Sequence, residues 1–151
     1  MTRIVAGSAK GRTLAVPKSG TRPTSERVRE ALFSRLEHMN VLAGAQVLDL
    51  YAGTGALGLE ALSRGATSAT LVERGTPAAR VAAANVRSTG LNARVVPADA
   101  RAFVSARRAD FLGGEFDLVF LDPPYDVSER EMSEVLAALD AWIGPDALIV
   151  V

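Results

Sequence analysis

The sequence of 151 residues contains no cysteine and a single histidine, His38. These absences exclude a disulfide framework, a thiolate metal site, a cysteine nucleophile and a metal site built from several histidines. No run approaches the roughly 18 apolar residues of a membrane span, and no long apolar run follows Arg3 as in a secretory signal. We therefore expect a cytoplasmic protein without metal or membrane partners, whose chemistry comes from carboxylates, hydroxyls, arginines and the backbone.

The residues that are present fit one compact domain with a small appendage. The chain is 48% hydrophobic and 23% charged, a globular composition, and its length is close to that of an average domain. The formal net charge is zero, yet residues 1–40 carry eight basic and three acidic residues, and residues 41–151 carry nine and fourteen. This asymmetry favours a phosphate-rich partner for the first segment, although a solvated tail could have the same charge.

The first part of the chain predicts a small basic hairpin. Extended runs at residues 2–6 and 12–16 flank a five-residue connection with two glycines, which suits a hairpin turn. All five charged residues among residues 1–25 are basic. We therefore expect residues 1–21 to form a basic hairpin and loop, and residues 22–151 to form the main domain.

A helix is expected after this loop. Thr24 or Ser25 can cap it, and it runs to about Met39. Its apolar side chains recur at near-helical spacing, at Val28, Leu32, Leu36 and Met39. The other face then carries charged side chains, namely Arg27, Arg29 and Glu30.

From Gln46 onward, strand-like and helix-like segments alternate. The strand-like runs are residues 46–50, 69–73, 93–97, 116–121 and 147–151. Connections of this length between parallel strands carry helices, so the alternation predicts an α/β fold with a mostly parallel, doubly wound sheet. Ligands of such sheets bind beyond the carboxyl ends of the strands, so the residues that follow each strand are the candidates for a site.

A glycine-rich turn follows the first of these strands. Residues 49–58 contain the pattern G-x-G-x-x-G and lead into a helix-like segment. Glycines let a ligand approach the backbone closely, and the amino terminus of a helix offers unpaired N–H groups. Taken alone, the pattern is weak, because a tight strand-to-helix turn can have the same glycines.

Acidic residues follow the second and third strands. Glu73 stands twenty residues after Gly53, where a carboxylate can accept hydrogen bonds from both ribose hydroxyls of a nucleoside cofactor. Asp99 can accept from an exocyclic adenine amine, or it can simply cap the next helix. Together the three strand ends favour a cofactor with ribose and adenine.

The fourth strand ends in the most specific motif of the chain, Asp122-Pro123-Pro124-Tyr125. The prolines stiffen the backbone and leave carbonyl groups available, while Asp122 supplies a carboxylate and Tyr125 an aromatic ring. This set suits an aromatic amine, because hydrogen bonds from the NH₂ group to a carboxylate and a carbonyl favour a nucleophilic nitrogen, and Tyr125 can stack on the base. A proline-rich stop after a buried strand is the purely structural alternative.

These motifs resemble the class I S-adenosylmethionine-dependent methyltransferases, and within them the amino-methylating branch with Asp/Asn-Pro-Pro-Tyr. The chain further resembles the RsmD family of bacterial 16S rRNA guanine-N2 methyltransferases. The segments that carry this resemblance are Arg3-Ile4-Val5-Ala6-Gly7, Lys10-Gly11-Arg12, Thr21-Arg22-Pro23-Thr24, residues 27–33 and residues 48–55. It covers nearly the whole chain and implies a Rossmann-like methyltransferase fold with a small N-terminal hairpin.

The resemblance also implies roles for individual residues. The residues that would hold S-adenosylmethionine are Asp49, Tyr51, Ala52, Gly53, Thr54, Gly55, Glu73, Asp99 and Ala100. Asp122 and the Pro123 carbonyl would bind the guanine N2 amine, and Tyr125 would stack on the guanine. The residues that would contact RNA phosphates are Arg3, Lys10, Arg12, Lys18, Arg22 and Arg27.

The implied substrate is a guanine of 16S rRNA in the small ribosomal subunit or an assembly intermediate, attacked directly at its N2 amine. Two alternatives stay open: an adenine-N6 DNA methyltransferase, which shares Asp-Pro-Pro-Tyr, and a noncatalytic rRNA-binding assembly factor with the same fold. A nicotinamide-dependent dehydrogenase shares the glycine-rich turn, but it has no use for Asp-Pro-Pro-Tyr and needs a separate substrate domain.

The methyltransferase fold usually continues past its fifth strand into an antiparallel hairpin, whereas this chain stops within the apolar run 148–151. We therefore expect C-terminal strands to be missing, which leaves an apolar strand at a sheet edge. Relative to a longer chain, which we expect to be monomeric, we expect lower stability or dimerisation.

Overall fold

The computed structural model describes residues 2–17, 25–106 and 115–151. Two short strands come first, β1 (Thr2–Arg3) and β2 (Thr13–Leu14), followed by helix α1 (Glu26–His38). The remaining elements are β3 (Gln46–Asp49), α2 (Ala56–Ser63), β4 (Ser68–Val72), α3 (Thr76–Thr89), β5 (Ala93–Val96), α4 (Ala100–Ser105), β6 (Phe116–Phe120), α5 (Glu129–Leu139) and β7 (Ile143–Val150). A 3₁₀ turn, Asp140–Trp142, joins α5 to β7.

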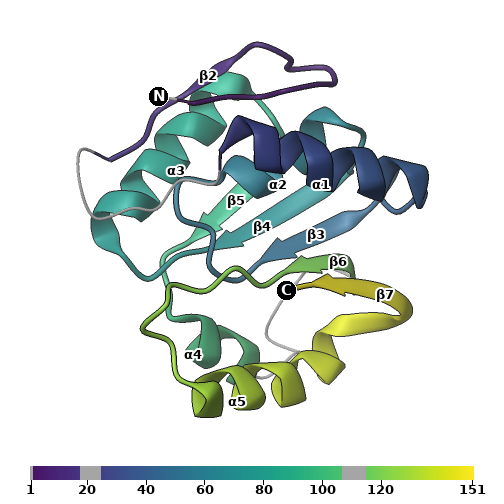
Figure 1. Ribbon diagram of the computed structural model, residues 1–151. Helices are drawn as coiled ribbons and strands as arrows, with labels where there is room; N and C mark the ends of the chain where they lie inside the picture. Colours follow the sequence, from purple (N-terminus) through teal and green to yellow (C-terminus); the bar gives the residue numbers. More distant parts are fainter. Residues whose placement is uncertain (1, 18–24, 107–114) are drawn as a thin grey trace.

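The central sheet has five strands in the order β5-β4-β3-β6-β7, and all neighbouring pairs are parallel. The chain first builds outward from β3 to β5, then returns to the other side of β3 for β6 and β7, so the strand order reverses between β3 and β6. Helices α1, α2 and α3 cover one face of the sheet, and α4 and α5 cover the other (Figure 1). This confirms the predicted doubly wound α/β fold. The carboxyl ends of β3 and β6 therefore flank the position at which such folds bind ligands.

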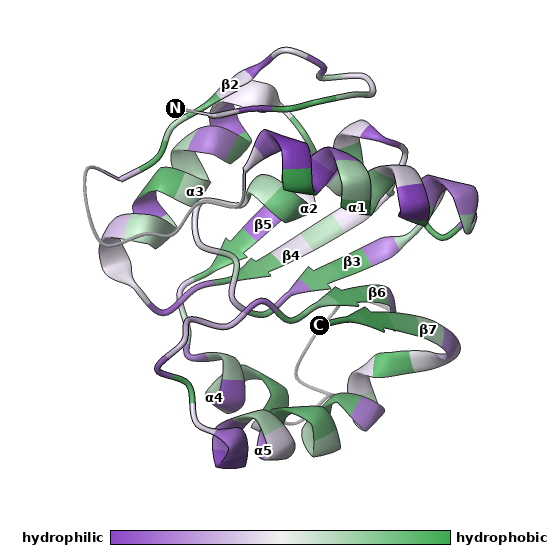
Figure 2. Cartoon of the chain, viewed as in Figure 1, coloured by the Kyte–Doolittle hydropathy of each residue, from purple (hydrophilic) through white to green (hydrophobic). Residues whose placement is uncertain are grey.

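Alternating side chains along the strands divide the core into two layers. On β3, Val47 packs with Leu71 and Phe120 on the side of α1, α2 and α3, whereas Leu48 packs with Val119 on the side of α4 and α5. Figure 2 shows the strands as mostly hydrophobic and the outer helix faces as hydrophilic. Within the described part of the chain, no helix is both long and apolar enough to cross a membrane.

Helix α1 begins and ends close to the predicted positions, but its buried face differs from the prediction. The Ser25 side chain accepts a hydrogen bond from the Val28 amide at 3.1 Å and caps the helix. Val28 is 58% exposed, and Arg29 is fully buried with Phe33 and Leu36. The spacing of apolar residues predicted that Arg29 lies on the outer face. That spacing contains no information about hydrogen-bond acceptors on other segments, and it is these acceptors that allow Arg29 to be buried.

Those acceptors belong to helix α2 and to the N-terminal hairpin. The Arg29 guanidinium donates to Thr2 Oγ1 at 3.1 Å and to the Arg3 carbonyl, and its Nε lies 3.8 Å from Glu60 Oε1. Burial lowers the pKa of Arg29, and the Glu60 carboxylate opposes this shift. The buried Arg29–Glu60 pair therefore joins α1, α2 and the first strand.

The N-terminal hairpin is present, with shorter strands than predicted. Thr2 pairs with Leu14 and Arg3 with Thr13, and the Ile4 amide still donates across the hairpin to the Arg12 carbonyl at 3.0 Å. The two amides that follow turn to α2, because Val5 and Ala6 donate to Glu60 at 2.9 and 3.1 Å. A Cβ on Gly7 would lie only 1.8 Å from the Ser63 carbonyl oxygen. The hairpin thus docks on α2 through backbone contacts that require glycine at residue 7.

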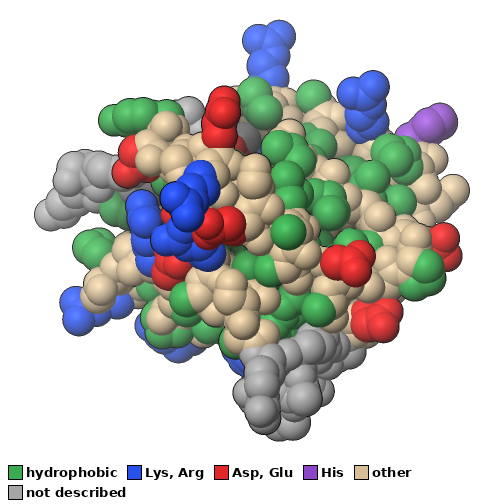
Figure 3. Space-filling view, turned by 90° about the horizontal axis from the view of Figure 1, so that it is seen from below, with side chains coloured by type: hydrophobic (Ala, Val, Ile, Leu, Met, Phe, Trp, Pro, Cys, Tyr) green, Lys and Arg blue, Asp and Glu red, His purple; other side chains and the backbone are tan. Residues whose placement is uncertain are grey.

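Helices α4 and α5 form the other layer with the 3₁₀ turn. The Trp142 indole donates to the Val104 carbonyl at 2.9 Å, and its ring stacks on Phe103 with centroids 4.9 Å apart. At the surface, Arg101 of α4 donates to Glu134 of α5 at 3.0 Å. Figure 3 views this layer from outside and shows basic and acidic side chains next to one another on it.

Candidate active site

The glycine-rich turn begins where β3 ends and leads into the start of α2. Gly53 and Gly55 both have left-handed backbone conformations, with φ of 56° and 88°. The Ala52 amide donates to the Val72 carbonyl at 3.0 Å, which ties the turn to the neighbouring strand β4. Gly55 precedes α2 and provides no side-chain cap, so the first amides of the helix stay available to a ligand with oxygen lone pairs.

Glu73 directly follows β4 and holds two glycine-containing turns together. Its Oε1 accepts from the Gly53 amide at 2.8 Å, and its Oε2 accepts from the Gly75 amide at 2.7 Å. Each carboxylate oxygen has a further lone pair for a hydroxyl group. The structure therefore brings the predicted ribose acceptor into direct contact with the predicted glycine-rich turn.

Asp49, the last residue of β3, is a fully buried carboxylate. Neither of its oxygens has a hydrogen-bond partner among the described residues. The pKa of Asp49 is raised to about 7, chiefly by burial and also by the negative charges of Asp122 and Glu73, while the Tyr51 amide opposes part of this shift. A buried carboxylate without a partner in such a position is suited to accept a cationic ligand group.

Asp99 follows β5 and caps helix α4 with one of its two carboxylate oxygens. The helix-cap role considered as an alternative from the sequence is therefore present. Asp99 Oδ2 accepts from the Ala102 amide at 3.1 Å at the start of α4, where Ala100 is buried. The other oxygen, Oδ1, lies 4.0 Å from Arg74 Nη1. The helix cap thus uses one carboxylate oxygen of Asp99, and the other lies near Arg74.

The Asp-Pro-Pro-Tyr segment leaves β6 at the same edge of the sheet. The Leu121 amide still pairs with the Val150 carbonyl at 2.8 Å, and the Val127 amide closes a turn on the Pro124 carbonyl at 3.1 Å. Between them Asp122 is exposed and the Tyr125 side chain is 94% exposed. A large aromatic ring held almost entirely in solvent offers a stacking surface rather than a core contact.

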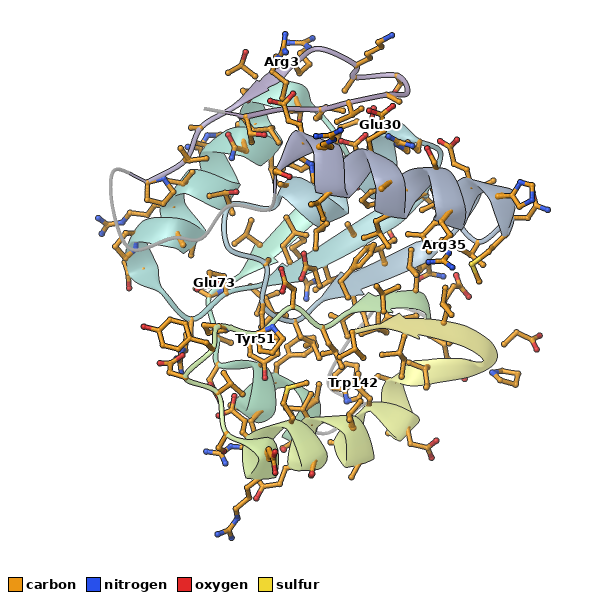
Figure 4. All side chains as sticks on the ribbon, in the orientation of Figure 1. Arg3, Glu30, Arg35, Tyr51, Glu73 and Trp142 are labelled. Carbon is orange, nitrogen blue, oxygen red and sulfur yellow. The ribbon has the colours of Figure 1, made fainter. Side chains whose placement is uncertain are left out.

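Tyr51 of the glycine-rich turn connects to the helix that follows this segment. Its hydroxyl donates to Glu131 Oε2 at 3.1 Å, in the first turn of α5. Burial and the Glu131 carboxylate raise the pKa of Tyr51. Figure 4 shows Tyr51 and Glu73 at the edge toward which the strands point. The predicted cofactor and acceptor segments are therefore neighbours in space.

Four of the six basic residues predicted to contact RNA lie in the described part of the chain, on the hairpin and on α1. Arg3 pairs with Glu26 at 3.6 Å, and Lys10 and Arg27 are exposed on the hairpin turn and on α1. Arg12 Nη1 donates to the Ser88 carbonyl at 3.4 Å near the end of α3, a helix about 20 Å long that starts beside Glu73. Lys18 and Arg22 lie outside the described residues.

Three residues that sequence reasoning passed over support the site. Arg74 lies between two carboxylates at its edge, and Glu131 accepts from Tyr51. Asn85 is buried on α3 and donates to the Thr54 and Ala15 carbonyls at 3.0 and 3.1 Å, which links the glycine-rich turn to the residue after β2. Its spacing from Ala79 and Ala82 places it on the buried face of α3, and a polar residue at that spacing was the signal for it.

The sheet order, the glycine-rich turn and the acidic strand ends together define a Rossmann-like class I methyltransferase fold. The family model described as "Conserved hypothetical protein 95" matches residues 2–151. The chain belongs to this family, the RsmD family of methyltransferases.

Relatives and solved structures agree with this assignment. Ribosomal RNA small subunit methyltransferase D of Escherichia coli K12 is 42% identical over 151 residues, which cover 99% of this chain and 73% of that protein. The Haemophilus influenzae protein of the same name is 36% identical, over 99% of this chain and 77% of its own length. The structure of Escherichia coli yhhF superposes with a TM-score of 0.84 at 41% identity, over 97% of this chain and 77% of that one. A hypothetical protein of Thermus thermophilus has the same TM-score at 37% identity, over 99% of this chain and 84% of its own.

Proposed function

We propose that this protein transfers a methyl group from S-adenosylmethionine to the exocyclic N2 amine of a guanine in 16S rRNA of the small ribosomal subunit. The observation that carries the proposal is the adjacency of two unlike sites at one sheet edge. One is a glycine-rich turn with buried Asp49 and bidentate Glu73, and the other is the exposed Asp122 and Tyr125 segment. The names of the Escherichia coli and Haemophilus influenzae relatives support ribosomal RNA as the substrate.

The chain's own residues fit the proposed cofactor. Asp49 offers the methionine ammonium group a buried carboxylate that has no hydrogen-bond partner among the described residues, and Gly53 and Gly55 supply the left-handed backbone conformations of the turn that follows it. Glu73 has lone pairs for the ribose hydroxyls, and Asp99 Oδ1 for the adenine amine. When bound, S-adenosylmethionine supplies an electrophilic sulfonium methyl group.

The residues after β6 would bind and orient the acceptor. The Asp122 carboxylate and the Pro123 carbonyl accept hydrogen bonds from the N2 amine, which localises the nitrogen lone pair for attack, and Tyr125 stacks on the base and fixes its plane. No side chain forms a covalent bond with the substrate, and the proton that N2 loses on methylation passes to the Asp122 carboxylate or to water. Alignment of nucleophile and electrophile alone can lower such a barrier by about 7 kcal/mol or more.

The proposal is tested by transfer of labelled methyl from S-adenosylmethionine to small ribosomal subunits that lack N2-methylguanine. Naked 16S rRNA and duplex DNA serve as parallel acceptors, and Asp122→Ala serves as the matched inactive variant. We expect label in the subunit sample, recovered as N2-methylguanine after nuclease digestion, and none with Asp122→Ala.

Two other results of the same assay would favour the two alternative functions considered from the sequence. Label in DNA as N6-methyladenine would move the assignment to an adenine methyltransferase. Subunit binding that Asp122→Ala leaves intact, without label in any sample from the wild-type protein, would favour a noncatalytic assembly factor.

A further inference from the structure

The guanidinium of Arg74 lies between carboxylates from two different strand ends. Its Nη1 is 4.0 Å from Asp99 Oδ1, after β5, and its Nη2 is 3.8 Å from Asp126 Oδ2, directly after the Asp-Pro-Pro-Tyr segment. Arg74 itself is the residue after Glu73. One cation is therefore shared by the proposed adenine acceptor and by the segment that carries Tyr125.

The two oxygens of Asp99 are not equivalent in this arrangement. Oδ2 accepts from the Ala102 amide and caps α4, so it is committed to the fold. Oδ1 faces Arg74 at 4.0 Å, longer than a direct hydrogen bond. An amine that donates to Asp99 Oδ1 would therefore compete with Arg74 without disturbing the helix cap.

The Asp126 side of the contact is exposed and lightly held. The Asp126 side chain is 64% exposed, that of Arg74 is 51% exposed, and the neighbouring Tyr125 is 94% exposed. The turn between Pro124 and Val127 is closed by one backbone hydrogen bond of 3.1 Å. A stronger hold of Arg74 on Asp126 would thus restrict the position of the Tyr125 ring.

We propose that Arg74 is a positioning residue that couples the cofactor site to the acceptor site. Occupation of Asp99 Oδ1 by the adenine amine releases the Arg74 guanidinium to Asp126, which holds the segment 122–127 in place for the target base. This inference rests on the proposed function, because it needs an adenine-containing cofactor at Asp99 and a base at Tyr125. It predicts that cofactor binding tightens RNA binding and, by linkage, that RNA binding tightens cofactor binding by the same factor.

The size of the coupling follows from the exposure of the groups. Half-exposed ion pairs are weakened by solvent and salt, so we expect a two- to five-fold effect, which decreases as the salt concentration rises. By the same reasoning, loss of Arg74 should leave the melting temperature nearly unchanged. An effect of Arg74 on ligand coupling can therefore be distinguished from an effect on the stability of the fold.

The test measures hydrogen exchange, with and without saturating S-adenosylhomocysteine, at the amides of residue 122 and residues 125–127, because the two prolines between them carry no N–H. Wild type is compared with Arg74→Gln and with Arg130→Gln, a control that removes an exposed arginine paired with Glu134 on α5. We expect two- to five-fold slower exchange on ligand binding in wild type and in Arg130→Gln, and no slowing in Arg74→Gln although it still binds the ligand. Equal slowing in Arg74→Gln would overturn the inference and leave the proposed function intact.

Two further outcomes have distinct meanings. If S-adenosylhomocysteine does not bind the wild-type protein, the cofactor assignment fails and the inference fails with it. RNA binding gives the second comparison: S-adenosylhomocysteine should tighten it two- to five-fold in wild type but not in Arg74→Gln or Asp126→Asn. If Arg74→Gln weakens RNA binding equally with and without S-adenosylhomocysteine, Arg74 contacts phosphate instead and the coupling is refuted.

Discussion

Gly53 and Glu73, twenty residues apart, are joined by a 2.8 Å hydrogen bond from the Gly53 amide to Glu73 Oε1. The second carboxylate oxygen takes the Gly75 amide at 2.7 Å, next to the start of α3. A single side chain therefore fixes the glycine-rich turn against the end of β4. The same carboxylate is the proposed ribose acceptor, so Glu73 contributes both to the shape of the turn and to binding at this edge.

Glu73→Gln is expected to weaken S-adenosylhomocysteine binding by about ten- to hundred-fold. Glutamine presents an NH₂ group to one of the two amide donors, so one charge-assisted hydrogen bond, worth about 1.5–3 kcal/mol, is lost together with a ribose acceptor. Isothermal titration calorimetry measures the affinity, with the exposed Glu30→Gln as the control. Unchanged affinity in Glu73→Gln would remove Glu73 from the cofactor site.

Asp49 makes the stability of the free protein depend on pH. Its folded pKa of about 7 lies above the ordinary aspartate value of 3.8, so between these values the folded state retains a proton that the unfolded state has lost. Stability then decreases as pH rises from about 4 to 7, by about 1.4 kcal/mol per pH unit at most. Asp49→Asn removes this titration, so its stability relative to wild type should increase by about 3 kcal/mol between pH 5 and pH 8 in urea denaturation. A pH-independent difference would contradict the buried, protonated Asp49.

Cofactor binding should show the opposite pH dependence. The ionised form of Asp49 attracts an ammonium group, and this form becomes populated as pH rises through about 7. The affinity for S-adenosylhomocysteine should therefore increase between pH 6 and pH 8 in wild type. In Asp49→Asn it should be weaker and nearly constant over this range, as calorimetry at each pH would show.

Glu60→Gln is expected to destabilise the protein by about 3 kcal/mol or more. The substitution leaves Arg29 buried opposite a neutral side chain and weakens the acceptor for the Val5 and Ala6 amides. Urea denaturation measures the loss. Glu37→Gln is the matched control, because Glu37 is a half-exposed partner of Arg64 and should contribute less than about 1 kcal/mol. Equal effects of both substitutions would show that the hairpin is not anchored by Glu60.

The parts of this molecule that the sequence predicts are those with a local pattern. Runs of apolar residues indicated the parallel strands. Because parallel strands bring their carboxyl ends to one edge, the positions of Glu73 and Asp99 after two of these runs indicated that they lie at the same edge. The last strand was predicted at residues 147–151, whereas β7 begins earlier, at Ile143. Its pairing with β6 changes register between Ile143 and Leu148, a stretch that contains Gly144 and Pro145 and has no alternating apolar pattern.

Arg29 and Arg74 show why the long-range ion pairs could not be predicted from the sequence. Each is one arginine among many, and its role is set by carboxylates at distant positions, Glu60 for Arg29 and Asp126 for Arg74. Only the packing of α1 on α2, and of one strand end beside another, brings these charges together. Long-range charge pairing has no period in the sequence, whereas burial of an apolar face does.

Tyr125 offers the sharpest separation of catalysis from stability. Because its side chain is 94% exposed, Tyr125→Ala should leave the melting temperature and S-adenosylhomocysteine affinity unchanged. Loss of base stacking, worth about 1–3 kcal/mol, should lower kcat/KM for small ribosomal subunits by about five- to hundred-fold, and Tyr125→Phe should retain most of the activity. Asp122→Asn should instead lower kcat, because the amine loses a charged hydrogen-bond acceptor while the stacking surface remains. If Tyr125→Ala keeps the wild-type kcat/KM in the methyl-transfer assay, the exposed ring does not hold the target base, and another surface must orient it.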